Sequence, residues 1–476
     1  MTAAVPPRAG TAAGRLLGEW NGEIAVFRGI PFAAPPVGEL RWRPPLRPGR
    51  WDGERPAREF GPAPLQPHPP TDSVMYRTNF DDPRALVMSE DCLYLNVWTP
   101  EPSPGAGLPV LVWIHGGGNR YGHGAQSIHD GRAMARRGLV VVTLNYRLGA
   151  LGFLAHPGLG EHSGNYGLHD IVAALTWVQE NIAAFGGDAG KVTLAGNSAG
   201  AAHICHLMAS QPARPLFGAA IGQSASGVGR AEGPLPTQEE AQKQGLLYAE
   251  GFGGRDIDAL RRLSGVELVV RGHFGPVVDG RVLAEASDDV FAAGRQHPVP
   301  LLVGTNSDEG TVYGPSRVPC GPEFDRLYPA GDARSAVRFT GESRFVYPVW
   351  HWARIHRAST GAPTWMYRFT RKPPLPSGLP DLGVYHTAEL PYALDNLDQR
   401  PGWPWRPLDR RLADTMADAW ARFAATGDPN GGTLPTWPVF SGADDAPVMV
   451  FGETVHPDVS ERLAAMHLLD GLPRPL

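Results

Sequence analysis

The feature that most constrains the fold is an alternation of short apolar runs with longer amphipathic segments. Four runs rich in β-branched residues, bounded by Gly, Pro or polar residues, span 110–114, 139–144, 192–195 and 299–303, as is typical of buried parallel strands. A helical pattern covers 169–185, where apolar residues recur at intervals of three and four before Gly186 and Gly187. This alternation predicts an α/β fold with a doubly wound, mostly parallel sheet, helices on both faces and active residues after the strands.

The chain contains no internal repeat, and its one shift in composition is a proline-rich stretch over residues 31–70. We therefore expect a single domain over residues 1–476 with long loop insertions. Near the end, a helix is predicted over 410–425, closed by the turn residues Gly427, Asp428, Pro429 and Asn430.

Charge and composition exclude several classes of function. A net charge of −5 and a charged fraction of 19% provide no basic field for nucleic acid. No apolar run is long enough for a membrane span, and the first residues lack the apolar core of a signal peptide. We therefore expect a cytoplasmic protein. Three cysteines, Cys92, Cys205 and Cys320, fit reduced thiols, and His203 and His206 beside Cys205 suit helix packing better than a metal site.

One G-x-S-x-G motif carries the strongest chemical signal. Gly196, Asn197, Ser198, Ala199 and Gly200 follow the predicted strand at 192–195 and open an apolar helix. Small residues are needed there because a serine held on a tight turn between strand and helix leaves no room for bulky neighbours. The motif predicts Ser198 as a nucleophile, and the alternative is a serine that caps a helix.

A serine hydroxyl needs donors for the oxyanion and a base, and the sequence offers both. The strand predicted at 110–114 is followed by His115, Gly116, Gly117 and Gly118. Hydrolases with a G-x-S-x-G nucleophile in an α/β sheet place their oxyanion donors in the loop at this position. We assign the donors to the amides of Gly117, Gly118 and Ala199. His115 is expected to anchor the loop, because the catalytic histidine of such hydrolases follows the acid along the chain.

The acid and the base remain open on sequence grounds alone. Asp308 and Glu309 both follow the strand predicted at 299–303, and both qualify chemically. Five histidines come later, namely His351, His356, His386, His456 and His467. His386 follows a loop rich in Pro and Gly, whereas His351 and His356 lie in a helical stretch where packing or surface roles suit them better. Four aromatic residues there suit a pocket or the core equally: Phe345, Tyr347, Trp350 and Trp352.

Across nearly its whole length the chain resembles the type-B carboxylesterases, the cholinesterase-like family that includes bacterial p-nitrobenzyl esterases. The resemblance is carried by the segments FRGIPF (27–32), SEDCLYLNVW (89–98), HGGG (115–118), NYR (145–147), NYGL (165–168), GNSAG (196–200), DEG (308–310), HTAEL (386–390) and GDP (427–429). It implies an α/β-hydrolase fold, hydrolysis of small-molecule carboxylic esters and no cofactor. It also implies Glu309 as the acid and His386 as the base of a Ser-Glu-His triad.

The chain departs from the family pattern at three positions near the expected site. Asn197 replaces the usual glutamate before the nucleophile, Asn119 replaces an aromatic residue that often follows HGGG, and Thr387 replaces the glycine after the catalytic histidine. Without a carboxylate at position 197, we expect the neutral form of the base to persist to lower pH. Family members with a disulfide at Cys92 have its partner near residues 63–65, where this chain has no cysteine.

The resemblance also suggests structural roles for five charged residues, which we expect to form buried ion pairs: Arg28, Glu90, Asp91, Arg147 and Asp170. Two alternatives to a simple carboxylesterase remain. One is a non-catalytic adhesion or scaffold protein that keeps the fold, which the complete triad disfavours. The other is a hydrolase of carbamates, lactones, lipid esters or bulky acyl groups. The sequence contains no signal for an oligomeric state.

Overall fold

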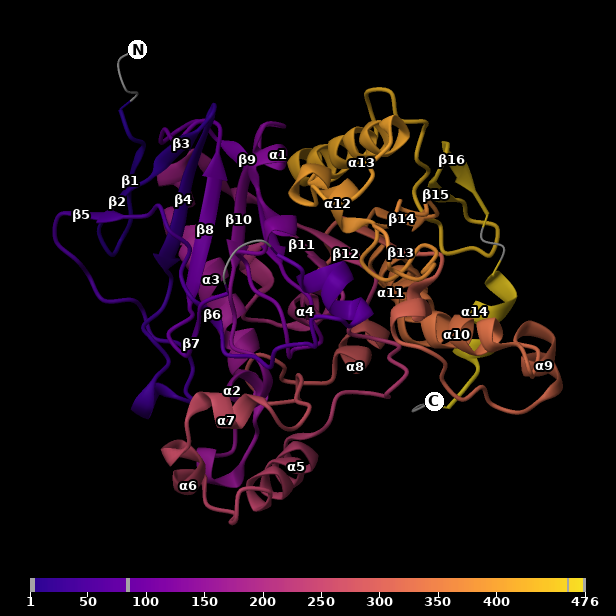
Figure 1. Cartoon of the computed structure of the whole chain (residues 1–476), viewed down its shortest axis with the longest axis horizontal. Helices are drawn as coiled ribbons and strands as arrows, with labels where there is room; N and C mark the ends of the chain where they lie inside the picture. Colours follow the sequence, from indigo (N-terminus) through magenta and orange to yellow (C-terminus); the bar gives the residue numbers. More distant parts are fainter. Residues whose placement is uncertain (1–4, 83–85, 460–461, 474–476) are drawn as a thin grey trace.

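A computed structural model describes residues 5–82, 86–459 and 462–473. Its centre is an 11-stranded sheet with the order β16-β15-β14-β13-β12-β11-β9-β10-β8-β4-β3 (Figure 1). The strands are β3 (Glu19–Asn21), β4 (Ile24–Pro31), β8 (Tyr94–Thr99), β9 (Leu108–Ile114), β10 (Val140–Leu144), β11 (Gly187–Asn197), β12 (Ala219–Gln223), β13 (Leu301–Asn306), β14 (Thr364–Phe369), β15 (Val448–Phe451) and β16 (Val455–Asp458). All strands from β10 to β15 along this order are parallel. The prediction of a mostly parallel sheet is confirmed.

Helices cover both faces of the sheet, as the alternation predicts. The longest are α3 (Tyr166–Asn181), α4 (Ala199–Ala209), α5 (Gln238–Glu250), α11 (Tyr347–Thr360) and α13 (Pro407–Thr426). The pattern predicted over 169–185 is α3 followed by a 3-10 turn, Ile182–Phe185. The helix predicted over 410–425 is α13, which begins three residues earlier at a proline and ends where Gly427 takes a φ of 76°. Proline at a helix start and glycine just past its end are favoured for their backbone geometry.

Smaller elements complete the described chain and form the edges and loops around the sheet. They are β1 (Arg8–Gly10), β2 (Arg15–Leu17), β5 (Glu54–Pro56), β6 (Ala63–Pro64), β7 (Met88–Ser89), α1 (Arg132–Ala135), α2 (Gly149–Phe153), α6 (Ile257–Arg262), α7 (Gly265–Val269), α8 (Ser287–Ala292), α9 (Pro322–Leu327), α10 (Ala333–Gly341), α12 (Leu390–Ala393) and α14 (Leu463–Asp470). Within the described ranges, no helix has the length and apolar character that a bilayer crossing requires.

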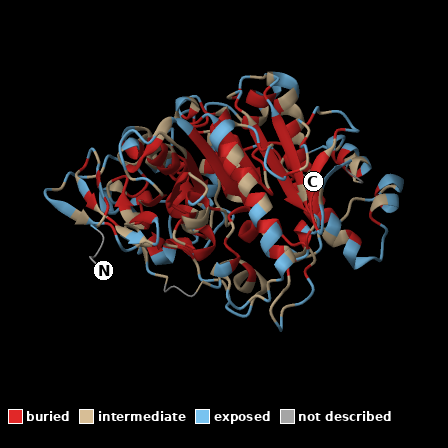
Figure 2. Cartoon of the chain, turned by 90° about the horizontal axis from the view of Figure 1, so that it is seen from above, coloured by how far each residue is buried: buried red, intermediate tan, exposed pale blue. Residues whose placement is uncertain are grey.

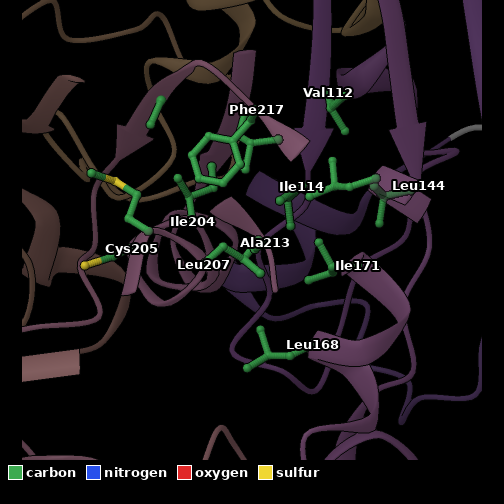
Figure 3. Packing of buried hydrophobic residues seen from close by; sticks show 14 of the residues in the cluster. Val112, Ile114, Leu144, Leu168, Ile171, Ile204, Cys205, Leu207, Ala213 and Phe217 are labelled. Carbon is green, nitrogen blue, oxygen red and sulfur yellow. The ribbon is translucent and has the colours of Figure 1, made fainter. Parts of the chain in front are cut away.

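The sheet separates two hydrophobic cores because successive side chains of a strand point to opposite faces. On β9, Val110, Val112 and Ile114 pack with α3, α4 and α11, whereas Leu111 and Trp113 pack with α13. Figure 3 shows part of the first core, where Ile114 lies near Ile171 of α3 and Ile204 of α4. The central strands are almost entirely buried, and exposure is greatest on outer helix faces and loops (Figure 2). Every apolar residue of β10, β12, β13, β14 and β15 is therefore buried, whichever face it occupies, whereas Trp20 on the edge strand β3 is 38% exposed.

Strand register brings three distant segments to one edge of the sheet. Gly196 of β11 pairs with Ile114 of β9, Asn197 pairs with Gln223 of β12, and Gln223 pairs with Gly304 of β13. The loops that follow β9, β11 and β13 consequently leave the sheet side by side at its carboxyl edge, where open α/β sheets bind ligands.

Candidate active site

Ser198 lies on the sharp turn between β11 and α4. Its φ of 56° and ψ of −130° lie outside the helical and strand regions, a strained geometry that persists only when the surroundings impose it. The Ser198 N–H donates to the Gln223 carbonyl at 2.8 Å. A Cβ would lie 2.7 Å from the Ile114 carbonyl oxygen at Gly196, and 2.1 Å from it at Gly200. The Ser198 side chain makes no capping hydrogen bond, so the helix-cap alternative is wrong.

The HGGG loop after β9 lies directly against this turn. A Cβ at Gly116 would lie 2.6 Å from the Asn197 carbonyl oxygen, and one at Gly117 would lie 2.1 Å from the Tyr121 carbonyl oxygen. Gly117 and Gly118 have φ values of 108° and 62°, which glycine adopts without steric cost. Both line a cavity that Ser198 also lines, and Ala199 lines a second cavity that again includes Ser198 and Gly118.

His115 anchors this loop from inside the protein. It is fully buried, its ring stacks on Tyr146 with centroids 4.4 Å apart, and its Nδ1 lies 2.9 Å from the Gly116 carbonyl oxygen. The Tyr146 hydroxyl donates to the His115 carbonyl at 2.9 Å. Burial holds the pKa of His115 well below its usual value, so this imidazole stays neutral and is occupied by packing.

Glu309 and His386 form a buried pair beside Ser198. Glu309 begins a 3-10 turn (Glu309–Val312) just after β13 and is 1% exposed, while His386 is 3% exposed. The His386 Nδ1–H donates to Glu309 Oε2 at 2.6 Å, and the Asn306 N–H donates to Glu309 Oε1 at 2.7 Å. His386 Nε2 has no hydrogen-bond partner within the described part of the chain, and His386 lines the same cavity as Ser198.

Asp308 points away from this pair. Its carboxylate accepts the Val384 N–H at 2.8 Å, and its own N–H donates to the Val384 carbonyl at 3.0 Å. A Cβ at Gly383 would lie only 2.4 Å from Asp308 Oδ2. Asp308 thus ties down the loop that leads to His386, and it does so from an exposed position.

The other candidate histidines lie elsewhere. His356 is buried with Nε2 2.9 Å from the Val299 carbonyl oxygen, and His351 lies 3.3 Å from Asp470. His467 lies 3.0 Å from Asp444, and His456 is on the edge strand β16. None of them lines either cavity at Ser198.

Glu389 is a site residue that the sequence analysis missed. It is fully buried, and its Oε1 accepts hydrogen bonds from Asn197 at 2.8 Å and Gln223 at 3.1 Å. Its Oε2 accepts one from Asn306 at 2.5 Å. Burial raises the pKa of Glu389, and the charge of Glu309 raises it further. Its position three residues after His386, in the same motif, was the available signal.

Two aromatic residues surround the imidazole of His386. Phe345 lies with its ring centroid 4.4 Å from that of His386, and Tyr313 lies at 5.5 Å. Burial raises the pKa of Tyr313 to about 12, and a hydrogen-bond interaction with the Ser198 side chain opposes that rise. These rings reduce the water around the imidazole, which strengthens the electrostatic interactions in the site.

The two cavities that meet at Ser198 measure ≈ 300 Å³ and ≈ 490 Å³. Of the four aromatic residues that suited pocket or core equally, Phe345 lines the larger cavity, while Tyr347, Trp350 and Trp352 belong to the core. His203 and His206 pack as expected but also line the larger cavity. Burial lowers the pKa of His203 to about 3, so that histidine is neutral.

The three departures from the family pattern have structural consequences. The Asn197 amide donates to Glu389, so a carboxylate lies close to position 197 although residue 197 has none. Asn119 and Thr387 have φ values of 61° and 80°. Positive φ is unusual for a β-branched residue, which explains why glycine suits position 387, and the Thr387 hydroxyl is hydrogen-bonded to Asn79.

The expected buried ion pairs are present only in part. Arg147 and Asp170 form a bidentate pair with both hydrogen bonds at 2.8 Å, and Glu90 pairs with Arg41. Arg28 pairs with the partly exposed Glu19. Asp91 accepts a hydrogen bond from the Tyr94 hydroxyl at 3.0 Å. Asp91 forms no ion pair with any described residue, so the expectation is wrong for Asp91, whose carboxylate is satisfied by a tyrosine instead. All three cysteines are free thiols.

Comparison with known proteins identifies the family of the chain. A family model described as the carboxylesterase family matches residues 2–319 and 325–468. The chain is 39% identical to a fumonisin B1 esterase of Sphingopyxis macrogoltabida over 91% of this chain and 84% of that protein. It is 37% identical to a phenmedipham hydrolase of Pseudarthrobacter oxydans, with 94% and 95% covered.

Further similarity is seen to a para-nitrobenzyl esterase of Bacillus subtilis, at 33% identity with 90% and 92% covered. The crystal structure of a Geobacillus stearothermophilus carboxylesterase superposes with a TM-score of 0.82 at 34% identity, covering 97% of this chain and 99% of that one. The sheet thus has the α/β-hydrolase fold, and the chain belongs to the carboxylesterase family as a carboxylic ester hydrolase.

Proposed function

We propose that this protein is a serine carboxylesterase that hydrolyses small-molecule esters through an acyl-enzyme on Ser198. The main support is the buried His386–Glu309 hydrogen bond of 2.6 Å, combined with an unpartnered His386 Nε2 in the cavity that Ser198 lines. In this proposal Ser198 is the nucleophile, His386 the base and Glu309 the acid. The amides of Gly117, Gly118 and Ala199 form the oxyanion hole.

In the first half-reaction, His386 Nε2 accepts the Ser198 proton as Oγ attacks the ester carbonyl carbon. Glu309 accepts the Nδ1–H throughout, so it fixes the tautomer that leaves Nε2 unprotonated and stabilises the imidazolium once it forms. The carbonyl oxygen becomes an oxyanion, to which the three amides donate. His386 then protonates the departing alcohol oxygen as the tetrahedral intermediate collapses.

The second half-reaction repeats these steps with water. His386 takes a proton from a water molecule that attacks the acyl carbon, and returns it to Ser198 Oγ as the acid leaves. Each residue therefore ends in its starting state. No step requires a cofactor. We expect such an enzyme to work in the cytoplasm.

Labelling with a fluorophosphonate, followed by mass spectrometry of the peptides, tests the nucleophile. We expect one adduct, on Ser198, and its loss together with hydrolysis of 4-nitrophenyl acetate in Ser198→Ala. Ser224 is a control because it has the same positive φ of 56° as Ser198 but is fully buried, whereas Ser198 is partly exposed. Ser224→Ala should retain labelling and hydrolysis, and an adduct on Ser224 or another serine would refute the proposal.

A further inference from the structure

The charge of the two cavities at Ser198 is opposite in sign to that of the whole protein. The chain has a net charge of −5, yet the two linings contain four arginines and one glutamate: Arg120, Arg230, Arg344, Arg400 and Glu232. Even partial burial of cations without partners beside a reactive centre is costly, and such an arrangement therefore requires an explanation.

In the larger cavity, the arginines have an acidic partner within the protein. Arg344 pairs with Glu232 at 3.3 Å, and Arg230 lies 3.9 Å from the same carboxylate. Arg344 also lies over the ring of Tyr313. Glu232 thus partly neutralises both arginines, and they have interactions within the protein.

In the smaller cavity, no acidic side chain of a described residue forms an ion pair with an arginine. Arg400 lies over the ring of Trp403 at 4.9 Å, and its guanidinium makes no hydrogen bond or ion pair with any described residue. Asp81 and Asp82 are near enough to favour its charge, but burial is the larger influence and lowers the pKa of Arg400. The residue nevertheless remains partly exposed. Arg400 is therefore surrounded by protein but still accessible from the cavity, as expected for a residue of the cavity wall.

Arg120 is a second cation of this smaller cavity that no acidic side chain satisfies. Its Nη2–H donates to the Val270 carbonyl at 3.3 Å, and its Nε lacks a partner within the described residues. The guanidinium also lies 5.7 Å from the Tyr121 ring centroid. Apart from histidines, these two arginines are the residues of the lining that can carry a positive charge, and the other lining residues are apolar, aromatic, glycine, amide or hydroxyl residues.

We propose that the natural substrate is an ester bearing a free carboxylate, which Arg120 and Arg400 bind in the smaller cavity. This deepens the proposed function and rests on it. A planar guanidinium matches a carboxylate geometrically and forms strong, charge-assisted hydrogen bonds with it. The two arginines would hold the carboxylate while the apolar wall, including Phe80 and Leu390, contacts the carbon chain.

Two matched pairs of esters test the proposal and locate the carboxylate. In the acyl pair, mono-4-nitrophenyl glutarate is compared with 4-nitrophenyl pentanoate, where a methyl replaces the carboxylate. In the alcohol pair, 4-carboxyphenyl acetate is compared with 4-methylphenyl acetate. For each pair the ratio of kcat/KM for the anionic ester to that for the neutral ester is measured in the wild type, Arg120→Gln and Arg400→Gln. Comparing ratios between proteins removes differences in intrinsic reactivity.

In at least one pair, we expect the ratio to fall by about 10- to 100-fold in Arg400→Gln and in Arg120→Gln, the effect of losing a charged hydrogen bond. Arg411→Gln, on the exposed side of α13, is the control and should leave both ratios unchanged. Ratios that stay the same in Arg120→Gln and Arg400→Gln for both pairs would overturn the proposal. Persistence of all four hydrolyses in Ser198→Ala would instead refute the proposed function, so the two failures are distinguishable.

Discussion

Two buried charge clusters in this protein are built in opposite ways. Arg147, after β10, and Asp170, on α3, join one cation to one anion through two side-chain hydrogen bonds of 2.8 Å and a third from the Arg147 N–H at 3.0 Å. The second cluster joins one imidazole to Glu309, adds the buried carboxylate of Glu389, and leaves His386 Nε2 without a partner among described residues.

The difference separates a cluster that holds the fold from one that can react. In the first, each charge is neutralised by its partner, and nothing about it changes during a reaction. In the second, two carboxyl groups lie near an imidazole whose Nε2 has no partner among the described residues, so a proton that arrives there is stabilised by Glu309. Unfavourable electrostatics in the resting state are expected at sites that act on protons.

Removing the charge of Glu309 should have the largest effect and should fall on activity. We expect Glu309→Gln to lower kcat by about 10³- to 10⁴-fold, because the glutamine amide can no longer stabilise the imidazolium or enforce its tautomer. Unfolding by urea should show a much smaller change in stability. A kcat within tenfold of wild type would contradict the assignment of Glu309.

Removing the charge of Asp170 in the single variant Asp170→Leu should lower the stability of the fold instead of the activity. Breaking a buried ion pair at one partner costs about 3–5 kcal/mol of unfolding free energy, because it leaves the Arg147 guanidinium uncompensated. The activity of the folded fraction should be retained. The double variant Arg147→Met with Asp170→Leu is the control, and it should recover much of the loss. If the single variant were as stable as wild type, the pair would not hold the fold.

Glu389→Gln should have an intermediate effect that depends on pH. The NH2 group of a glutamine at this position would face the amide donors of Asn197 or Asn306 with no acceptor. We expect this to lower the free energy of unfolding by about 1–3 kcal/mol. Because the pKa of Glu389 is raised above 4.5 in the folded protein, the folded state holds this proton to higher pH than the unfolded state. Wild-type stability is therefore lost as pH rises from about 4.5 through the folded value.

The wild-type advantage over Glu389→Gln should consequently shrink between pH 4.5 and neutrality, as measured by chemical unfolding at a series of pH values. Asn306→Ala removes a hydrogen-bond donor that lowers the pKa of Glu389. In this variant the free energy of unfolding should therefore fall more steeply with rising pH than in the wild type. An advantage that grows with pH would show that the three amides outweigh burial and the charge of Glu309.

Asp308→Asn should have the smallest effect. The asparagine carbonyl oxygen can still accept the Val384 N–H that Asp308 now accepts at 2.8 Å, and the side chain is exposed. We expect less than about 1 kcal/mol on either stability or the activation barrier, as for most surface substitutions. A large drop in kcat here, with a mild effect in Glu309→Gln, would exchange the roles of the two carboxylates.

Local patterns were sufficient for the parts of the fold that depend on local geometry. β9, β10, β11 and β13 were predictable from apolar runs, and the turn at Ser198 from its glycines, because strand burial and tight turns constrain nearby residues. β12 was not, since its residues Ala219, Ala220, Ile221, Gly222 and Gln223 favour strands weakly. Its conformation follows from burial between β11 and β13, with Gly222 so close to Trp352 that a Cβ would lie 2.4 Å from the ring.

Side chains that meet only in three dimensions were harder to predict. Glu309 and His386 lie 77 positions apart, and spacing did not distinguish them from Asp308 or the other histidines, so family resemblance was needed. Glu389 stood out only as part of the segment HTAEL (386–390). Arg120 and Arg400 belong to none of the motifs that the sequence analysis identified. The surroundings of these residues are formed by segments that are distant in sequence, and the local pattern of apolar residues does not reveal such contacts.

The close contact between Gly116 and the Asn197 carbonyl has a consequence for redesigning the enzyme. A methyl group at Gly116, Gly196 or Gly200 would collide with backbone rather than with a movable side chain. The loop after β9 and the turn at Ser198 therefore cannot be changed independently of each other. A library that randomises either loop should contain almost no active members. Variation that changes substrate range is better directed at side chains that face the cavities, where neighbours can rearrange without displacing the backbone.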